Sequence, residues 1–281
     1  MRIANLGGRL VLVTAEETAV DVETASAGRF GPDPMSAFAD WDLFREWAAT
    51  VDAAGAVFDR AELGPPVPRP PQIFAIGVNY REHAEEAGYP PDSLPVTFTK
   101  FVSSLTGPAA TVALPEGNVD WEVELVVAIG VGGHDIRRAD AWEHVAALTI
   151  GQDLSERLAQ MAGQRPQFSL AKSHPGFSPT GPWLVTPDEL DDPADLAISC
   201  TLDGEILQES RTSRMIYDIP ELIARLSAIV TLLPGDIIFS GTPSGVGNAR
   251  TPKRFLQPGE ILTSTIEGLG ELTTRFTEGR S

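Results

Sequence analysis

The sequence predicts an α+β fold that is rich in β-strands and has a small N-terminal domain. Three observations lead to this prediction. Short apolar stretches with strand-like alternation recur along most of the 281 residues, and few segments have helical periodicity. A proline-rich stretch, GPPVPRPPQ at 64–72, suits neither a helix nor a central strand and marks a boundary. We therefore expect a small α/β module at 1–68 and a larger domain of mixed sheets at 69–281.

The N-terminal module contains two local patterns. Residues 1–26 alternate weakly around a Gly-Gly turn, which predicts short strands in a hairpin. Residues 34–53 carry an aromatic stripe at spacings of three and four residues, formed by Phe38, Trp41, Phe44 and Trp47. This spacing predicts an amphipathic helix. We interpret the stripe as core or interface and assign it no ligand.

In the larger domain, apolar runs predict strands at 73–80, 96–101, 119–130 and 146–153. Helices are expected at 81–88, 139–148 and 218–232, the last with Pro220 in its first turn. Hairpins are expected at 197–210, around an Asp203-Gly204 turn, and at 259–276.

Composition excludes some classes of function. The net charge of −18 argues against nucleic-acid binding and against binding to anionic membranes, since both need a basic surface. Cys200 is the one cysteine, so no intrachain disulfide can form, and we interpret it as a packing residue. We find no apolar run of membrane-spanning length and no signal-peptide pattern, and we predict a cytoplasmic protein.

The stretch VDWEVELVVAIG at 119–130 is unusual because it reads as a buried strand yet carries three acids. Alternation places Asp120, Glu122 and Glu124 on one face, where like charges repel each other. One interpretation is a strand with a solvated end, which we adopt for Asp120. The other is a cation site, in which Glu122 and Glu124 share a divalent ion with Asp153 from the next strand. An open set of carboxylates suits Mg²⁺ or Mn²⁺ better than Zn²⁺.

Two further patterns could carry chemistry. His83 and Glu86 are three residues apart on the expected helix, so the carboxylate could orient the imidazole as a general base. A surface turn without a role is the alternative. Lys172 precedes a Gly/Pro-rich loop and could stabilise an oxyanion, or it could be an ordinary loop lysine. Only three of the 21 basic residues are lysines, which draws attention to Lys100 and Lys172.

The glycine-rich segment GTPSGVG at 241–247 is a weak signal. Its backbone N–H groups could approach an anion, and Thr242 could bind a substrate. It matches neither common nucleotide-binding pattern.

Taken in order, six segments resemble the fumarylacetoacetate hydrolase family. They span 73–247 and read IFAIGVNYREHAEEAG, FTKFVSSLTGP, VDWEVELVVAIG, GQDLSER, AKSHPGFSPTGPWLVT and TLLPGDIIFSGTPSGVG. The resemblance implies the family's β-rich fold, a catalytic domain at 69–281, a homodimer, and one divalent cation, Mg²⁺ or Mn²⁺, per subunit.

The resemblance also implies roles for individual residues. Three match the family's metal-binding carboxylates: Glu122, Glu124 and Asp153. Three match catalytic positions, namely the lid pair that activates water and the lysine that contacts substrate oxygen: His83, Glu86 and Lys172. Four match positions that often line the pocket: Arg157, Lys100, Ser103 and Thr242. The chain departs from the family at His174 and Pro175, where relatives often have Phe-Asp, and at Phe101 and Val102, near which relatives often have proline.

The resemblance implies a metal-dependent hydrolase that cleaves a carbon–carbon bond in a β-diketo acid such as an acylpyruvate. His83, oriented by Glu86, would activate water, and Lys172 would stabilise the oxyanion. Relatives also decarboxylate oxaloacetate, or isomerise or hydrate unsaturated 2-oxo acids, with the same residue types. A non-catalytic structural homologue is a further alternative. The expected partner is a small 2-oxo or diketo acid.

Overall fold

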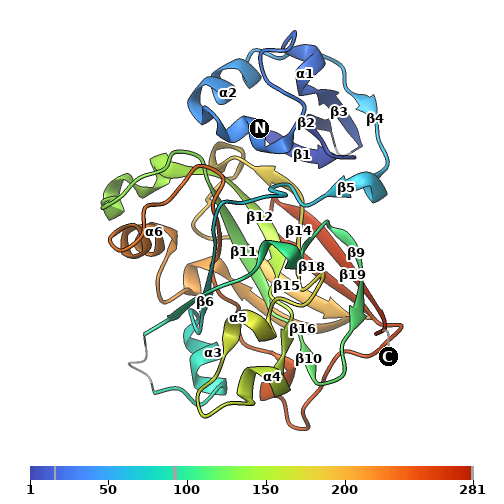
Figure 1. Cartoon of the computed structure of the whole chain (residues 1–281), viewed down its shortest axis with the longest axis vertical. Helices are drawn as coiled ribbons and strands as arrows, with labels where there is room; N and C mark the ends of the chain where they lie inside the picture. Colours follow the sequence, from blue (N-terminus) through green and yellow to red (C-terminus); the bar gives the residue numbers. More distant parts are fainter. Residues whose placement is uncertain (16, 91–93, 280–281) are drawn as a thin grey trace.

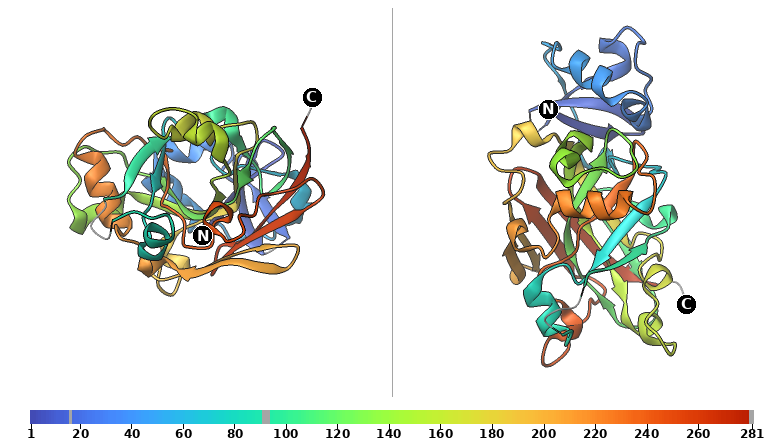
Figure 2. Two further views of the ribbon diagram at one scale, coloured as in Figure 1. Left: turned by 90° about the horizontal axis from the view of Figure 1, so that it is seen from below. Right: turned by 90° about the vertical axis from the view of Figure 1, so that its left-hand side faces the viewer.

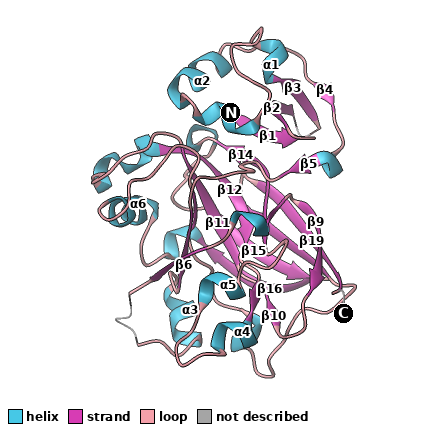
Figure 3. Ribbon diagram, in the orientation of Figure 1, coloured by secondary structure: helices cyan, strands magenta, loops and turns pink. Residues whose placement is uncertain are grey.

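The computed structural model describes residues 1–15, 17–90 and 94–279 (Figure 1). Strands dominate these residues, and the helices are few and short (Figure 3). The predicted α+β, strand-rich fold class is confirmed. No helix among the described residues has both the length and the apolar character needed to cross a membrane.

The larger sheet runs through both regions of the chain. Ten of its strands follow one path, in the order β4-β3-β2-β1-β14-β12-β11-β17-β6-β7, with β5 on β1 and β8 on β14. Its N-terminal strands are β1 (Arg2–Leu6), β2 (Arg9–Ala15), β3 (Thr18–Asp21), β4 (Ala56–Val57) and β5 (Leu63–Gly64). Its other strands are β6 (Ile73–Gly77), β7 (Val96–Thr99), β8 (Leu105–Thr106), β11 (Val123–Ile129), β12 (Val145–Gln152), β14 (Ser178–Val185) and β17 (Ile237–Phe239).

A second sheet packs beside the first in the order β16-β15-β18-β19-β9. Its strands are β9 (Ala109–Leu114), β15 (Ala197–Leu202), β16 (Glu205–Arg211), β18 (Ile261–Ile266) and β19 (Gly270–Glu278). A two-stranded ladder joins β10 (Val119–Asp120) to β13 (Ser155–Glu156). Both expected hairpins form here, β15 with β16 around Asp203-Gly204 and β18 with β19.

The helices connect and cover these sheets. The α-helices are α1 (Val22–Ala25), α2 (Trp41–Ala48), α3 (Arg81–Glu86), α4 (Arg157–Met161), α5 (Phe168–Ala171) and α6 (Ile219–Ser227). The 3₁₀ turns are η1 (Pro34–Phe38), η2 (Arg60–Glu62), η3 (Val102–Ser104), η4 (Arg138–His144), η5 (Pro187–Glu189), η6 (Thr212–Arg214) and η7 (Gly247–Ala249).

Two helix predictions need correction. The stretch 34–53 is not one helix, because Asp40 accepts a hydrogen bond from Leu43 N and starts α2 separately from η1. The stretch 139–148 is a 3₁₀ turn up to His144 and then enters β12 at Val145. Pairing of β12 with β11 and β14 overrides the local helical pattern of that segment.

The N-terminal strands continue the larger sheet through the pairing of β1 with β14, where Ile3 faces Leu184. Figures 1 and 2 place these strands at one end of the molecule, while α3 and α4 lie at the opposite end. The division at residue 68 stays a prediction, since the shared sheet crosses it.

The strand β11 is buried on both faces and separates two apolar clusters. Val123, Leu125 and Val127 belong to one cluster. Val126 and Ala128 belong to the other. The alternation expected from the sequence is therefore present, and the acids lie just where β11 begins. The ends of β11 and β12 at this point carry the candidate site.

Candidate active site

Strand register brings three carboxylates together. Val123 pairs with Gln152 across β11 and β12, and the backbone N–H of Asp153 donates to the carbonyl of Glu122 at 2.9 Å. Carboxylate oxygens of Glu122, Glu124 and Asp153 all lie within 4.8 Å of one another, and all three residues are buried. The expected cluster therefore exists, built from two adjacent strands.

Close packing behind the cluster fixes this register. A Cβ at Gly151 would lie 2.5 Å from Val126 Cγ2 and 2.6 Å from the ring of Phe239. Only glycine therefore lets β12 approach β11 and β17 at this point.

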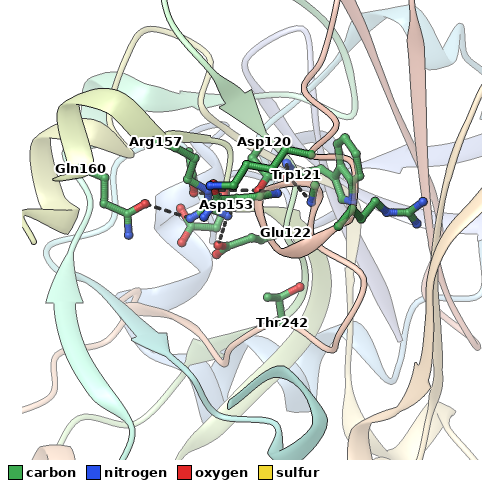
Figure 4. Close-up of polar contacts among 12 residues, drawn as sticks. Asp120, Trp121, Glu122, Asp153, Arg157, Gln160 and Thr242 are labelled. Carbon is green, nitrogen blue, oxygen red and sulfur yellow. Dashed lines mark hydrogen bonds and ion pairs between the residues drawn. The ribbon is translucent and has the colours of Figure 1, made fainter. Parts of the chain in front are cut away.

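Three buried basic side chains contact the carboxylates, and Figure 4 shows one of them, Arg157, beside Glu122. Lys172, at the end of α5, donates from Nζ to Glu122 Oε2 at 2.6 Å and to Asp153 Oδ2 at 2.7 Å. Lys100 donates to Asp153 Oδ1 at 2.5 Å and to the carbonyl of Lys172. Arg157, at the start of α4, donates from Nη2 to Glu122 Oε1 at 2.6 Å.

Burial and the neighbouring charges shift the pKa values of Glu122 and Glu124 in opposite directions. Burial raises the pKa of Glu122, but the positive charges of Lys172 and Arg157 outweigh it and hold this pKa well below its usual range. Burial raises the pKa of Glu124, and the negative charges of Asp153 and Glu122 raise it further. Glu124 accepts a hydrogen bond from Gly241 N at 2.8 Å, the one donor recorded for it among the described residues. Negative potential is therefore concentrated at Glu124.

The pKa values of Lys100 and Lys172 are shifted as well. Burial lowers the pKa of Lys100 below its ordinary value, although Asp153 opposes this. Burial also acts to lower the pKa of Lys172, but the carboxylates of Asp153 and Glu122 outweigh it and raise the pKa. Lys172 therefore stays an ammonium ion.

The donor set fits a divalent cation. Three carboxylates are the oxygen ligands that Mg²⁺ and Mn²⁺ prefer. Each carboxylate oxygen has two acceptor positions, so a hydrogen bond from a lysine leaves room for a second partner. With all of these groups ionised, four buried acids (Asp120 and the three above) face three buried basic groups, which leaves one negative charge. A divalent ion would reverse the sign of this cluster and allow an anionic substrate to approach, despite the net charge of −18.

The histidine–carboxylate pair lies in the same cavity. His83 is buried on α3, and its Nδ1 is 2.7 Å from Glu86 Oε1. Val78, just before α3, has a φ of 62°, unusual for a β-branched residue, and turns the chain from β6 toward the helix. Side chains of His83, Glu86, Glu122, Arg157 and Lys172 line one cavity of ≈ 290 Å³.

The structure does not bring every predicted residue to this cavity. Lys100 is buried behind it and contacts Asp153. Ser103 is exposed on η3. The residue after it, Ser104, is buried and its hydroxyl forms a hydrogen bond with Ser178. Thr242 lines the cavity, but its hydroxyl donates to Val123 O at 2.9 Å. That hydroxyl therefore cannot also donate to a substrate.

The prediction of a solvated Asp120 is wrong. Asp120 is fully buried, and Arg157 Nη2 lies 3.0 Å from its Oδ2. Gln160, one turn after Arg157, accepts from that guanidinium at 2.9 Å and also lines the cavity (Figure 4). Sequence reasoning missed Gln160, although its spacing from Arg157 on a helix was a usable signal. In the sequence Asp120 resembles a solvated acid, because no local pattern reveals its partners.

Cys200 is buried within β15, as expected for a packing residue. Burial raises the pKa of its thiol to about 12, so it is not an activated nucleophile.

Comparisons with known proteins agree with the geometry. Residues 72–277 match the family model described as the fumarylacetoacetate (FAA) hydrolase C-terminal domain. A solved structure from Mycobacterium smegmatis, provisionally named HpcE, is 56% identical, covers 100% of both chains and superimposes with a TM-score of 0.95. A maleylpyruvate hydrolase from Sphingobium, solved with manganese(II) and pyruvate, is 30% identical over 100% of both chains, with a TM-score of 0.82.

A curated relative from Bos taurus, a mitochondrial oxaloacetate tautomerase, is 43% identical over 212 residues, which is 75% of this chain and 68% of the relative. Members of the family are thus enzymes of more than one reaction class, and several are named for small 2-oxo acids. This chain belongs to the fumarylacetoacetate hydrolase family.

Proposed function

We propose that this protein is a cation-dependent enzyme that moves a proton on an enolisable 2-oxo dicarboxylic acid of the oxaloacetate type, interconverting its keto and enol forms. One observation carries the proposal. The His83–Glu86 pair, with 2.7 Å between Nδ1 and Oε1, lies in the same cavity as Glu122 and Lys172. A candidate base and a cluster of charges thus line one cavity, which supports a reaction on one small substrate.

Each side chain has a part in this reaction. Glu86 accepts the Nδ1 proton of His83, which leaves Nε2 of the neutral imidazole free to remove a proton from C3 of the substrate. The negative charge then develops on the oxygen at C2, where the Lys172 ammonium stabilises it. His83 returns the proton to that oxygen, and the enol leaves. In this scheme Lys100 supports Asp153 and does not contact the substrate.

Arg157 is suited to hold a substrate carboxylate. Of its five N–H groups, the one on Nε donates to Asp120, one on Nη2 donates to Glu122 and one on Nη1 donates to Gln160. Nη2 also lies 3.0 Å from Asp120 Oδ2 as an ion pair. One N–H on Nη1 remains for the substrate. A divalent cation, Mg²⁺ or Mn²⁺, held by Glu122, Glu124 and Asp153 would supply Lewis-acid stabilisation of the developing negative charge.

The similarities support this reaction class. Relatives named as oxaloacetate tautomerases are 40–43% identical to this chain. The hydrolase cited above is 30% identical.

Hydrolysis of a β-diketo acid is the second candidate. The cavity of ≈ 290 Å³ has room beyond a four-carbon acid, and the same His83–Glu86 pair could deprotonate a water molecule. One cation per subunit, a homodimer and a cytoplasmic location stay predictions alongside either reaction.

The test follows the loss of enol absorbance from fresh oxaloacetate, with Mg²⁺ or Mn²⁺ and with a chelator, while NMR monitors the products. We expect cation-dependent loss of the enol without matching release of pyruvate. His83→Gln should lower the rate at least about 100-fold, the usual contribution of a general base. His134→Gln is the matched control, because His134 is exposed and pairs with Asp135 away from the cavity.

Other products would redirect the proposal. Pyruvate formed in step with enol loss would make the protein a decarboxylase. Pyruvate and a free acid from an acylpyruvate, with oxaloacetate unchanged, would favour the hydrolase. Cation binding without turnover of any of these acids would favour a non-catalytic homologue.

A further inference from the structure

The glycine-rich segment after β17 contains a loop, residues 245–248, that contacts the histidine–carboxylate pair. The backbone N–H of Gly245 lies 3.1 Å from Glu86 Oε1 and 3.0 Å from Glu86 Oε2, and donates to this carboxylate. Glu86 Oε1 is the atom that meets His83 Nδ1. The position of Gly245 therefore determines where the Glu86 carboxylate lies.

The other end of this loop rests on Asp120. Asp120 Oδ1 accepts from Gly247 N at 2.7 Å, and its Oδ2 accepts from Asn248 N at 2.8 Å. The neighbouring Trp121 donates from Nε1 to the carbonyl of Gly245 at 3.2 Å. The two residues that directly precede Glu122 thus hold the loop that holds Glu86.

Packing leaves this loop little freedom. A Cβ at Gly247 would overlap the backbone oxygen of Arg254 and would lie 2.8 Å from both Asp120 Oδ1 and the Trp121 ring. The backbone therefore lies directly on the Asp120 carboxylate, which is itself fully buried. A buried carboxylate that lost these donors would be strongly destabilised, so the contacts are maintained.

We propose that Asp120 is a positioning residue for the base. It fixes residues 245–248 so that the Gly245 N–H keeps Glu86 turned toward His83, and Glu86 then fixes the Nδ1–H tautomer of the imidazole. The role of His83 as base rests on the proposed function, whereas the chain of contacts from Asp120 to His83 does not. The segment that supplies the cation-binding acids therefore also orients the base.

Asp120 also contacts Arg157, and the test must distinguish an effect through Arg157 from an effect through the loop at 245–248. Its Oδ2 accepts from Arg157 Nε at 3.1 Å, so it could act on substrate binding alone. If Asp120 acted on substrate binding alone, the tautomer of His83 would not change when Asp120 is substituted.

The experiment reads the tautomer of His83 in metal-free protein labelled with ¹⁵N-histidine. The side-chain ¹⁵N shifts are recorded above the ordinary histidine pKa, and His83→Gln assigns the signals among the four histidines. We expect wild-type His83 to carry its proton on Nδ1. Asp120→Asn keeps the side-chain volume but directs an NH₂ donor toward the backbone N–H groups that Asp120 accepts from. It should raise the Nε2–H population of His83 about fivefold, as for the loss of one hydrogen bond.

Three further variants complete the design. Trp121→Phe removes the Nε1–H donor to Gly245 and should shift the tautomer in the same direction by an independent route. Arg157→Lys should raise KM and leave the tautomer unchanged. Asp236→Asn is the matched control, because Asp236 is a fully buried aspartate that accepts from Leu233 N at 2.7 Å outside the cavity lining. It should lower Tm without moving the His83 signals.

The proposal is overturned if His83 is not an Nδ1–H tautomer in the wild type. It is also overturned if Glu86→Ala changes the tautomer while Asp120→Asn and Trp121→Phe do not. These spectra need no substrate, so an absence of tautomerase activity would reject the proposed function and leave the role of Asp120 to be decided by the His83 signals. With active enzyme, Asp120→Asn should also lower kcat about tenfold, by analogy with the loss of an outer-shell partner.

Discussion

The two sides of the candidate site are held in different ways. The carboxylates lie at the ends of β11 and β12, central strands with every residue buried. His83 and Arg157 lie on α3 and α4, helices of six and five residues. Helices this short are not stable alone in water, so tertiary contacts must hold them. The sheet thus fixes a concentration of charge, while polar contacts fix the groups that would meet the substrate.

This difference has an energetic consequence. The carboxylate cluster gathers buried charges that need one another, including Arg157 on α4 and Lys172 at the end of α5. In contrast, α3 depends on a few hydrogen bonds, such as Glu86 with Gly245 and Arg214 with Glu82 at 3.0 Å. Substitutions in the charged cluster should therefore change global stability, and substitutions on α3 should act locally.

The largest effect is expected for Lys172→Met. Removing the ammonium leaves Glu122 and Asp153 with an uncompensated buried charge, which should lower the free energy of unfolding of the metal-free protein by about 3–5 kcal/mol. Denaturant unfolding measures this. Adding Mn²⁺ should restore more stability to the variant than to the wild type, because the cation replaces the missing charge. Lys253→Met, at an exposed lysine, is the control, and an equal loss there would contradict the comparison.

The second-largest effect is expected for Glu124→Gln. Glu124 suffers repulsion from Asp153 and Glu122, so a neutral amide should raise Tm of the metal-free protein. The same change removes a proposed cation ligand. It should weaken Mn²⁺ binding, measured by calorimetry, at least about 100-fold, which is more than expected for a residue that only supports a ligand. Glu271→Gln, at an exposed glutamate, should change neither quantity. Unaltered Mn²⁺ affinity in Glu124→Gln would remove this residue from the cation site.

The smallest effect is expected for Glu85→Gly, at an exposed position of α3. Glycine lowers helix stability by about 1 kcal/mol relative to alanine, so the local opening of α3 should become more frequent. Hydrogen exchange of the Ala87 amide, which donates to His83 O at 3.0 Å, should accelerate about fivefold while Tm stays unchanged. Glu85→Ala is the control. A drop in Tm as large as that of Lys172→Met would show that α3 unfolds with the sheet.

Several parts of this site could be predicted from local spacing. Alternation places Glu122 and Glu124 on one face of a strand, and helical spacing places His83 beside Glu86. The order of six short segments indicates the family, and the matched family model agrees. Each of these signals depends only on residues that are near each other in the chain or on their order.

Other parts could not be predicted in this way. Residues 139–148 have a helical pattern, but β11 and β14 compete for the same backbone groups and draw its second half into β12. Asp120 looks like a solvated acid, yet its partners Arg157 and Gly247 are 37 and 127 residues away. No local pattern describes such partners.

The sequence by itself determined the strand-rich fold class, the carboxylates at 122 and 124, and the histidine–carboxylate pair, because these follow from side-chain periodicity and residue chemistry. The tertiary structure alone decided which charges meet. It buried Lys100 behind Asp153, left Ser103 exposed, and placed Asp120 beneath residues 245–248. The reason is physical: a buried charge is stable only beside a partner, and strand register and loop packing choose that partner from distant parts of the chain.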